Sequence, residues 1–195
     1  MGRPESGKER LLKAALQEFS ERGYKRTTLE DIAARADVSK GTLYNYFRSK
    51  EEIFDQACDY AFKCWDDWAC ERAEEAEDPL DKLRTLAREL YAYLGEHPEI
   101  KRLLRREPDL FPVFGPLTYR HGGDLDTVKM LRSILASGIK QGSVRDMDIE
   151  GVIQILGAIF RLFVVGYADL DEPERRNLAE AALNIIVDGL KARGD

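Results

Sequence analysis

Apolar residues recur at spacings of three and four along almost the whole chain, and this periodicity constrains the fold more than any other sequence feature. Such spacing places apolar side chains on one face of an α-helix, whereas a half-buried strand would alternate with a period of two. No segment shows sustained alternation, and no long internal repeat is present. The sequence therefore predicts an all-α fold.

Capping residues divide this pattern into separate helices. Ser6 with Glu9, and Ser49 with Glu52, have the spacing of a capping box, and Gly23 is expected to end the first helix in a left-handed conformation. Segment 107–123 contains three prolines and three glycines and is predicted to be a loop with short helical turns. The predicted helices cover residues 6–22, 28–36, 39–47, 50–77, 79–95, 98–106, 124–141, 148–168 and 173–193.

The composition is typical of a globular protein that buries a core, since 44% of the 195 residues are hydrophobic and 34% are charged. The most apolar segment, residues 151–167, includes Gln154 and Arg161 and is shorter than the ~20 residues of a membrane span. Residues 1–10 are polar and lack the apolar run of a signal peptide. We therefore expect a cytoplasmic protein without a membrane partner.

Three cysteines, Cys58, Cys64 and Cys70, follow one another at a spacing of six. Six steps along an α-helix rotate a side chain by about 240°, so the three thiols point in different directions and cannot bind one metal ion together. Ordinary, partly buried cysteines and a redox sensor both fit this pattern, and no basic cluster favours the sensor. His97 and His121 are isolated and lack metal-ligand spacing, so neither a metal nor a cofactor is expected.

The net charge of −6 conceals an asymmetry along the chain. Residues 1–50 hold 11 Lys and Arg against 7 Asp and Glu, whereas residues 51–195 hold 19 against 29. A basic N-terminal segment on an acidic remainder suits local contact with phosphates and little non-specific adhesion elsewhere.

Segment 27–54 contains the pattern of two short helices, 28–36 and 39–47, joined by a tight turn. Leu43 and Phe47, four residues apart, anchor the second helix to a core, while polar and aromatic residues occupy its other faces. A helix-turn-helix inserts such a second helix into the major groove of DNA. The residues left free for contact are Lys40, Gly41, Thr42, Tyr44, Asn45 and Tyr46.

Three N-caps lie close together in this segment, at Thr28, Ser39 and Ser49. Helix N-termini bind phosphate through their free N–H groups and dipole. Lys50 lies in the first turn of the following helix, where a cation opposes the dipole, so its presence there suggests a phosphate partner.

The same segment resembles the DNA-binding domain of the TetR family of transcriptional regulators over about residues 8–55. The shared pattern is T-x-x-x-I-A-x-x-A-x-V-S-x-G-x-L-Y-x-x-F-x-S-K-E-x-L/I-F. One departure is Tyr46, where the family often has His. The pattern is met by Thr28, Ile32, Ala33, Ala36, Val38, Ser39, Gly41, Leu43, Tyr44, Phe47, Ser49, Lys50, Glu51, Ile53 and Phe54.

The resemblance implies a role for each matching position. It implies a three-helix DNA-binding domain over residues 1–50 and a helical ligand-binding and dimerisation domain over residues 51–195. It further implies a repressor that binds a roughly palindromic double-stranded operator as a homodimer and leaves it when a small-molecule effector binds. Base contacts fall to Lys40, Gly41, Thr42, Tyr44 and Asn45, and phosphate contacts to Thr28, Ser39, Tyr46 and Lys50, with Tyr44 also close to the backbone.

The last two predicted helices are more apolar than one small core requires. Helix 148–168 is apolar around most of its circumference, and helix 173–193 has two apolar faces. A second subunit would cover the apolar surface that the core of one chain does not bury. The TetR resemblance also implies a dimer interface here. The predicted interface residues are Ile155, Ala158, Leu162, Leu178, Ala182 and Ile185.

An effector pocket is expected among the central helices, where aromatic residues are frequent. Arg161 could neutralise an anionic effector, or it could pair with a neighbouring charge within the fold. The candidate pocket residues are Phe62, Trp65, Trp68, Tyr91, Phe111, Phe114, Tyr119 and Arg161.

Two other classes of protein fit the sequence less well than a regulator. An enzyme is not expected, because the sequence contains no phosphate-binding loop, dinucleotide glycine motif, nucleophile elbow or HExxH zinc motif. A dimeric protein-interaction adaptor, or an activator without a small-molecule ligand, is the alternative reading. The exposed polar surface predicted for residues 40–46 favours DNA.

Overall fold

The computed structural model describes residues 6–107, 124–166 and 171–192, and these ranges are almost entirely helical. The predicted all-α fold is confirmed, and the structure also contains an isolated antiparallel bridge between Val144 and Lys191. The helices are α1 (Gly7–Arg22), α2 (Leu29–Arg35), α3 (Lys40–Tyr46), α4 (Lys50–Ala73), α5 (Pro79–Glu96), α6 (Pro98–Arg106), α7 (Asp126–Gln141), α8 (Ile149–Arg161) and α9 (Glu172–Leu190).

Reciprocal capping boxes begin the first two helices. The Ser6 hydroxyl accepts from the Glu9 N–H while the Glu9 carboxylate accepts from the Ser6 N–H, as the sequence predicts. Thr28 and Asp31 form the same arrangement at the start of α2. These boxes satisfy N–H groups that a helix N-terminus otherwise leaves without a partner, so α1 and α2 begin at the predicted residues.

Two of the predicted caps differ in detail. At the start of α4, Ser49 accepts from the Glu52 N–H, but the Glu52 carboxylate accepts from the Arg48 N–H and the box is only half formed. Gly23 ends α1 with φ 81° and ψ 159°, which is not the left-handed helical conformation expected. Glycine tolerates this backbone because it has no Cβ.

Three helices end earlier than predicted. Helix α4 stops at Ala73, because the acidic residues Glu74, Glu75 and Glu77 would oppose the helix dipole at a C-terminus. Helix α8 passes into a π-helical turn, Leu162–Gly166. Helix α9 stops at Leu190, where the following backbone is held by hydrogen bonds to the α7–α8 connection, including one from the Ala192 N–H to the Ser143 carbonyl.

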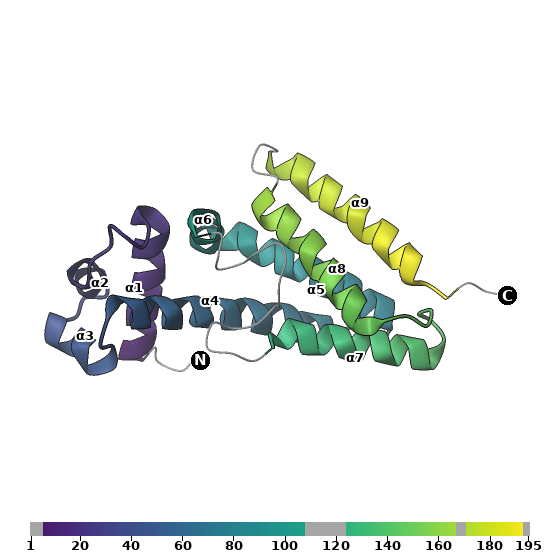
Figure 1. The fold of residues 1–195 in the computed structure, drawn as a ribbon, viewed down its shortest axis with the longest axis horizontal. Coiled ribbons are helices and arrows are strands. Elements are labelled where there is room, and N and C mark those ends of the chain that lie inside the picture. Colours follow the sequence, from purple (N-terminus) through teal and green to yellow (C-terminus); the bar gives the residue numbers. More distant parts are fainter. Residues whose placement is uncertain (1–5, 108–123, 167–170, 193–195) are drawn as a thin grey trace.

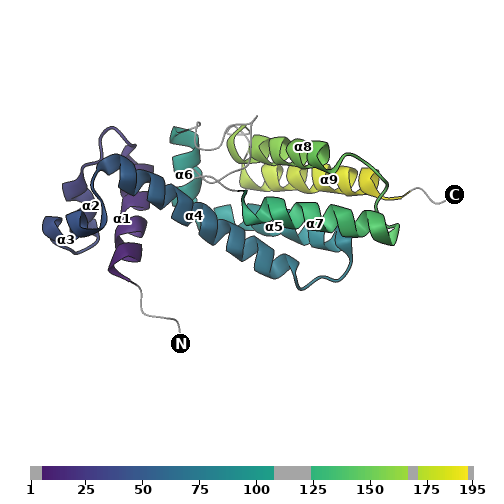
Figure 2. The ribbon, with the colours of Figure 1, turned by 60° about the horizontal axis from the view of Figure 1, so that its bottom comes forward.

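Helices α1, α2 and α3 gather at one end of the molecule, and α4 extends from that end along the body (Figure 1). Helices α5, α7, α8 and α9 form the body, while α6 lies between the two parts and packs against α1 (Figure 2). Within the described part of the chain, we find no helix whose length and apolarity would suffice to span a bilayer.

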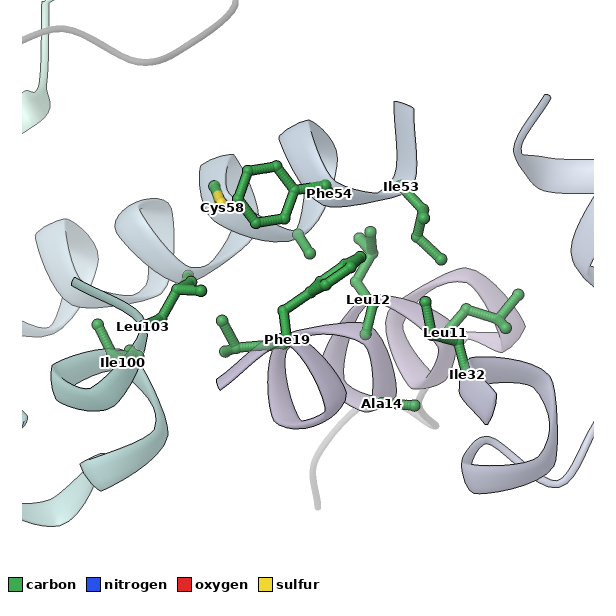
Figure 3. Packing of buried hydrophobic residues seen from close by; sticks show 14 of the residues in the cluster. Leu11, Leu12, Ala14, Phe19, Ile32, Ile53, Phe54, Cys58, Ile100 and Leu103 are labelled. Atoms are coloured by element: carbon green, nitrogen blue, oxygen red, sulfur yellow. The ribbon is translucent and has the colours of Figure 1, made fainter. Parts of the chain in front are cut away.

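Two clusters of buried apolar side chains hold these parts together. The first joins α1–α3 to α4 from Ile53 to Trp65, to the end of α5 and to α6, with Phe19 facing Phe54 at a ring-centroid distance of 4.9 Å (Figure 3). The second joins α4, α5, α7, α8 and α9 around Leu86 and Leu135. Helix α4 contributes to both clusters, so it connects the N-terminal helices mechanically to the body.

Candidate DNA-binding surface and effector cavity

Helix α3 has one buried and one exposed face. The side chains of Leu43 and Phe47 are fully buried, as their four-residue spacing predicts. Tyr44 and Tyr46, by contrast, keep 48% and 44% of their surface exposed. The helix is therefore fixed from behind and leaves an aromatic surface open to a partner.

The other predicted base-contacting residues also lie on the accessible side of α3. Lys40, Gly41 and Asn45 are exposed, and Thr42 is partly buried. Ser39 caps the helix by accepting from the Thr42 N–H at 3.0 Å. A Cβ placed on Gly41 would come within 4 Å of only the Ser39 hydroxyl, so the backbone here is open to close approach.

An ion-pair network that the sequence analysis did not single out holds α2 on α1. The Arg35 Nε lies 2.6 Å from the carboxylate of Glu18, and its Nη2 lies 2.6 Å from that of Glu21. Glu18 is buried and is also bound by Arg22 at 3.1 Å. In the sequence, the one indication of this network is Glu18, a carboxylate next to Phe19 in the apolar stripe of α1. This network orients α2 and, through the following turn, α3.

The Lys40 ammonium interacts with two other side chains of the protein. Its ammonium pairs with the carboxylate of Glu30 on α2 and lies 5.8 Å from the centre of the Tyr44 ring. The hydrogen bond with Glu30 raises the pKa of Lys40 above its ordinary value, so the side chain is a cation at neutral pH. Because more than half of each side chain is exposed, exchange of Glu30 for a base acceptor costs little.

Three of the predicted phosphate-contacting residues are exposed on the same end of the molecule. The Thr28 hydroxyl is engaged in its capping box, donating to the Asp31 carboxylate at 2.7 Å. Ser39 is exposed at the start of α3, and the Tyr46 hydroxyl lies beside Gly7 at the start of α1. Their contact with phosphate remains a prediction, which their exposure supports.

Lys50, the fourth predicted phosphate residue, is bound within the protein. Its ammonium donates to the carbonyl oxygens of Tyr24 at 2.9 Å, Thr27 at 3.1 Å and Lys25 at 3.4 Å. It also lies 4.5 Å from the centre of the Tyr24 ring. An ammonium has three hydrogens, so these carbonyls use all of its donors. Lys50 therefore ties the start of α4 to the connection between α1 and α2.

We expect Lys50→Met to lower the stability of the N-terminal helices by about 1–3 kcal/mol, because three carbonyl groups lose a charged donor. Chemical denaturation followed by circular dichroism measures this change. If Lys50 also contacts a phosphate, the salt dependence of DNA binding falls by about one in slope. An unchanged slope would leave Lys50 with the structural role alone.

A cavity of about 300 Å³ lies in the body and is lined by residues of α4, α5, α7, α8 and α9. Its wall is mostly apolar, with Leu86, Leu131, Phe160 and Leu183 among the lining residues. This size and lining are typical of a site for a small organic molecule.

The structure divides the predicted pocket residues into three groups. Trp65 and Tyr91 line the cavity. Phe62 and Trp68 do not: Phe62 is buried in the first apolar cluster, and Trp68 donates from Nε1 to the Glu89 carboxylate at 3.0 Å. Their ring size suggested a pocket wall, but their positions on α4 turn them toward other helices. Phe111, Phe114 and Tyr119 lie outside the described residues.

Arg161 is buried, with 1% of its surface exposed, but it does not line the cavity. Burial lowers the pKa of its guanidinium below the ordinary value. Of the two roles that the sequence left open for Arg161, the burial away from the cavity favours the structural one. The charged residues at the cavity are instead Asp66, Arg88, Arg176 and Glu180.

The predicted dimer surface lies on α8, the turn after it and α9. Ile155 and Ile185 are 60% and 74% exposed, and Leu162 and Leu178 are 40% exposed each. Ala158 and Ala182 are partly buried, and Ala182 also lines the cavity. Figures 1 and 2 show α8 and α9 as neighbours on the body. These side chains form an apolar surface of the kind that a second subunit covers.

The cysteines show no sign of an activated thiol. Cys58 is buried, and Cys64 and Cys70 are half-buried on α4. Burial raises the pKa of Cys70 to about 11 and raises that of Cys64 as well, so both are thiols at neutral pH. Thiolates are the reactive form, so this environment favours ordinary packing over redox sensing.

The sequence of this chain is similar to those of known regulatory proteins. The family model for bacterial regulatory proteins of the tetR family matches residues 11–57, close to the predicted range. The chain is 26% identical to the HTH-type transcriptional repressor KstR2 of Mycobacterium tuberculosis, over 99% of this chain and 97% of the relative. It is 27% identical to the HTH-type transcriptional regulator YhgD of Bacillus subtilis, over 95% and 97% respectively.

Solved structures share the fold over nearly the whole length. The fatty acid degradation regulator FadR of Bacillus halodurans matches with a TM-score of 0.76 at 19% identity, covering 98% of this chain and all of that one. The ketosteroid transcriptional regulator KstR2 of Mycobacterium tuberculosis matches with a TM-score of 0.64 at 25% identity, covering 98% of both chains.

An exposed α3 backed by Leu43 and Phe47, next to α2 and on the same core as α1, defines a helix-turn-helix DNA-binding protein. The match over residues 11–57 and the full-length relatives narrow this class to bacterial transcriptional regulators. Residues 11–57 match the DNA-binding segment of the tetR family, and the whole chain is similar to regulators named HTH-type transcriptional repressors.

Proposed function

We propose that the protein is a one-component repressor that binds a roughly palindromic operator as a homodimer and releases it when a small molecule fills the body cavity. The observation that carries this proposal is the exposed face of α3, with Tyr44 and Tyr46 open to solvent and Leu43 and Phe47 buried behind them. Relatives that align with the whole chain are named repressors, which supports the sign of regulation.

We assign residues 1–50 to DNA binding and residues 51–195 to effector binding and dimerisation. The first turns of α4 pack in the same apolar cluster as α1–α3. A movement of α4 therefore shifts the DNA-binding helices as well. The FadR of Bacillus subtilis, solved in complex with stearoyl-CoA, has this fold with a TM-score of 0.72 at 19% identity.

A polar contact links the cavity to α4. The carboxylate of Asp66, on α4, accepts from the backbone N–H of Asp126 at 2.9 Å and from the hydroxyl of Thr127, both at the start of α7. Asp66 and Thr127 also line the cavity. An effector that binds one arrangement of these helices better than another shifts the population of dimers, because the ligand's differential affinity sets the shift.

A dimer imposes a geometric requirement on the operator. Its two copies of α3 must reach successive major grooves, whose centres are about 34–36 Å apart. Selection of the purified protein on a pool of random DNA duplexes tests the proposal. We expect enrichment of a two-fold symmetric sequence. A protein that retains no duplex, or retains all duplexes alike, would point to the adaptor alternative.

Lys40→Ala is expected to weaken binding to the selected duplex by roughly tenfold to a hundredfold and to relax the preference at the base it meets. The reason is the loss of one cationic donor at the start of α3. Lys140→Ala, an exposed lysine near the end of α7, is the matched control and should change nothing. Fluorescence anisotropy on the selected duplex and on single-base variants gives both quantities. An equal loss on every variant would make Lys40 a phosphate contact.

A further inference from the structure

An ion pair between α5 and α9 lies at the edge of the cavity. The Arg88 guanidinium binds the Glu180 carboxylate with Nε–Oε1 and Nη2–Oε2 distances of 2.9 Å each. Both residues line the cavity, and their side chains are 51% and 38% exposed. The pair therefore lies where the apolar interior meets solvent. Two parallel N–H···O bonds are the geometry with which arginine recognises carboxylates in general.

The charges at the cavity favour an anionic partner at this edge. Asp66 is buried, and its carboxylate is bound by the start of α7. Arg176 precedes Glu180 by four residues on α9, is exposed, and makes no ion pair with a described residue. Apart from Asp66, the charged groups of the cavity lining are thus two guanidinium groups and one carboxylate. The remaining lining residues are uncharged, so the interior suits an apolar body.

We propose that the effector is an apolar molecule that ends in a carboxylate, and that this carboxylate takes the place of Glu180 on Arg88. The inference rests on the proposed function, because it names the chemical class of the effector. A partly exposed ion pair stabilises a fold only weakly, so Glu180 can be displaced. The incoming carboxylate has the additional stabilisation of its apolar body, which leaves water for the cavity.

The exchange acts on the helix that carries the predicted dimer surface. Once Arg88 binds the effector, Glu180 loses its partner on α5 and lies beside a second negative charge. Helix α9 then loses one of its links to α5, while its exposed Leu178 and Ile185 belong to the predicted interface. Occupation of the cavity is thereby coupled to the position of α9, and through the dimer to the separation of the two α3 helices.

Calorimetric titration of the full-length protein with dodecanoate and with dodecan-1-ol tests this inference. The two probes share an apolar chain and differ in the end group. We expect dodecanoate to bind about tenfold more tightly or better, because only the carboxylate can form the paired hydrogen bonds with Arg88.

Three variants test whether the Arg88–Glu180 ion pair causes the preference for dodecanoate over dodecan-1-ol. Arg88→Gln should weaken dodecanoate binding about tenfold and leave dodecan-1-ol binding unchanged. Glu180→Gln should strengthen dodecanoate binding about two- to fivefold, because the competing carboxylate is gone. Arg84→Gln is the matched control: Arg84 lies one turn earlier on α5, pairs with Asp81 at 3.3 Å and does not line the cavity.

Equal binding of the two probes, an Arg88→Gln variant that keeps the preference, or no binding of dodecanoate to the folded protein would each overturn the inference. Circular dichroism of every variant verifies the fold. A protein that selects a symmetric duplex but ignores dodecanoate would retain the proposed function and lose only this effector class. A protein that binds dodecanoate but selects no duplex would retain the inference about the cavity and lose the function.

Discussion

Phe47→Ala is expected to destabilise the DNA-binding helices by about 3–5 kcal/mol, the usual cost of removing a fully buried phenylalanine ring. Phe47 follows the last residue of α3, and its N–H donates to the Leu43 carbonyl at 3.0 Å. Loss of the ring removes the contact that holds α3 against the core. We expect DNA binding to disappear together with the cooperative unfolding of this end of the protein.

Tyr44→Ala is the matched comparison, because Tyr44 lies on the exposed face of the same helix. It should change stability by less than about 1 kcal/mol and still weaken DNA binding. Urea denaturation followed by circular dichroism, combined with DNA titration, separates the two effects. A Phe47→Ala variant as stable as the wild-type protein would show that α3 is held by other contacts.

Ile185→Asp is expected to raise the dissociation constant of the dimer by about a hundredfold or more. Ile185 is 74% exposed in the single chain, so a carboxylate there costs the monomer almost nothing. In a dimer that covers this surface, the same carboxylate is buried without a partner, which is costly. DNA binding should fall with dimerisation, because a monomer can contact only one half-site.

Sedimentation velocity at micromolar concentration measures the oligomeric state directly. Ala136→Asp, which places the same charge at an exposed position on α7, serves as the control and should leave the dimer intact. A dimeric Ile185→Asp variant would remove α9 from the proposed interface. The complementary variant Ile155→Asp then tests whether α8 alone holds the subunits together.

The DNA-binding end was largely readable from the sequence. The capping box at Ser6, the N-cap at Thr28, the buried pair Leu43 and Phe47, and the exposed face of α3 all follow from spacings of three or four residues. The body was less readable. Aromatic content correctly suggested Trp65 and Tyr91 as cavity residues, but it also suggested Phe62 and Trp68, which pack elsewhere on α4.

Sequence alone determined the number and type of most described helices, the N-terminal caps of α1, α2 and α3, and the two faces of α3, because interactions between near neighbours along one helix decide these features. Tertiary structure decided which groups meet at the cavity edge and where Lys50 directs its ammonium. Arg88 and Glu180 are 92 positions apart, and Lys50 binds carbonyl groups more than 20 positions before it. Such contacts depend on the angles at which distant helices cross, and helical periodicity does not encode those angles.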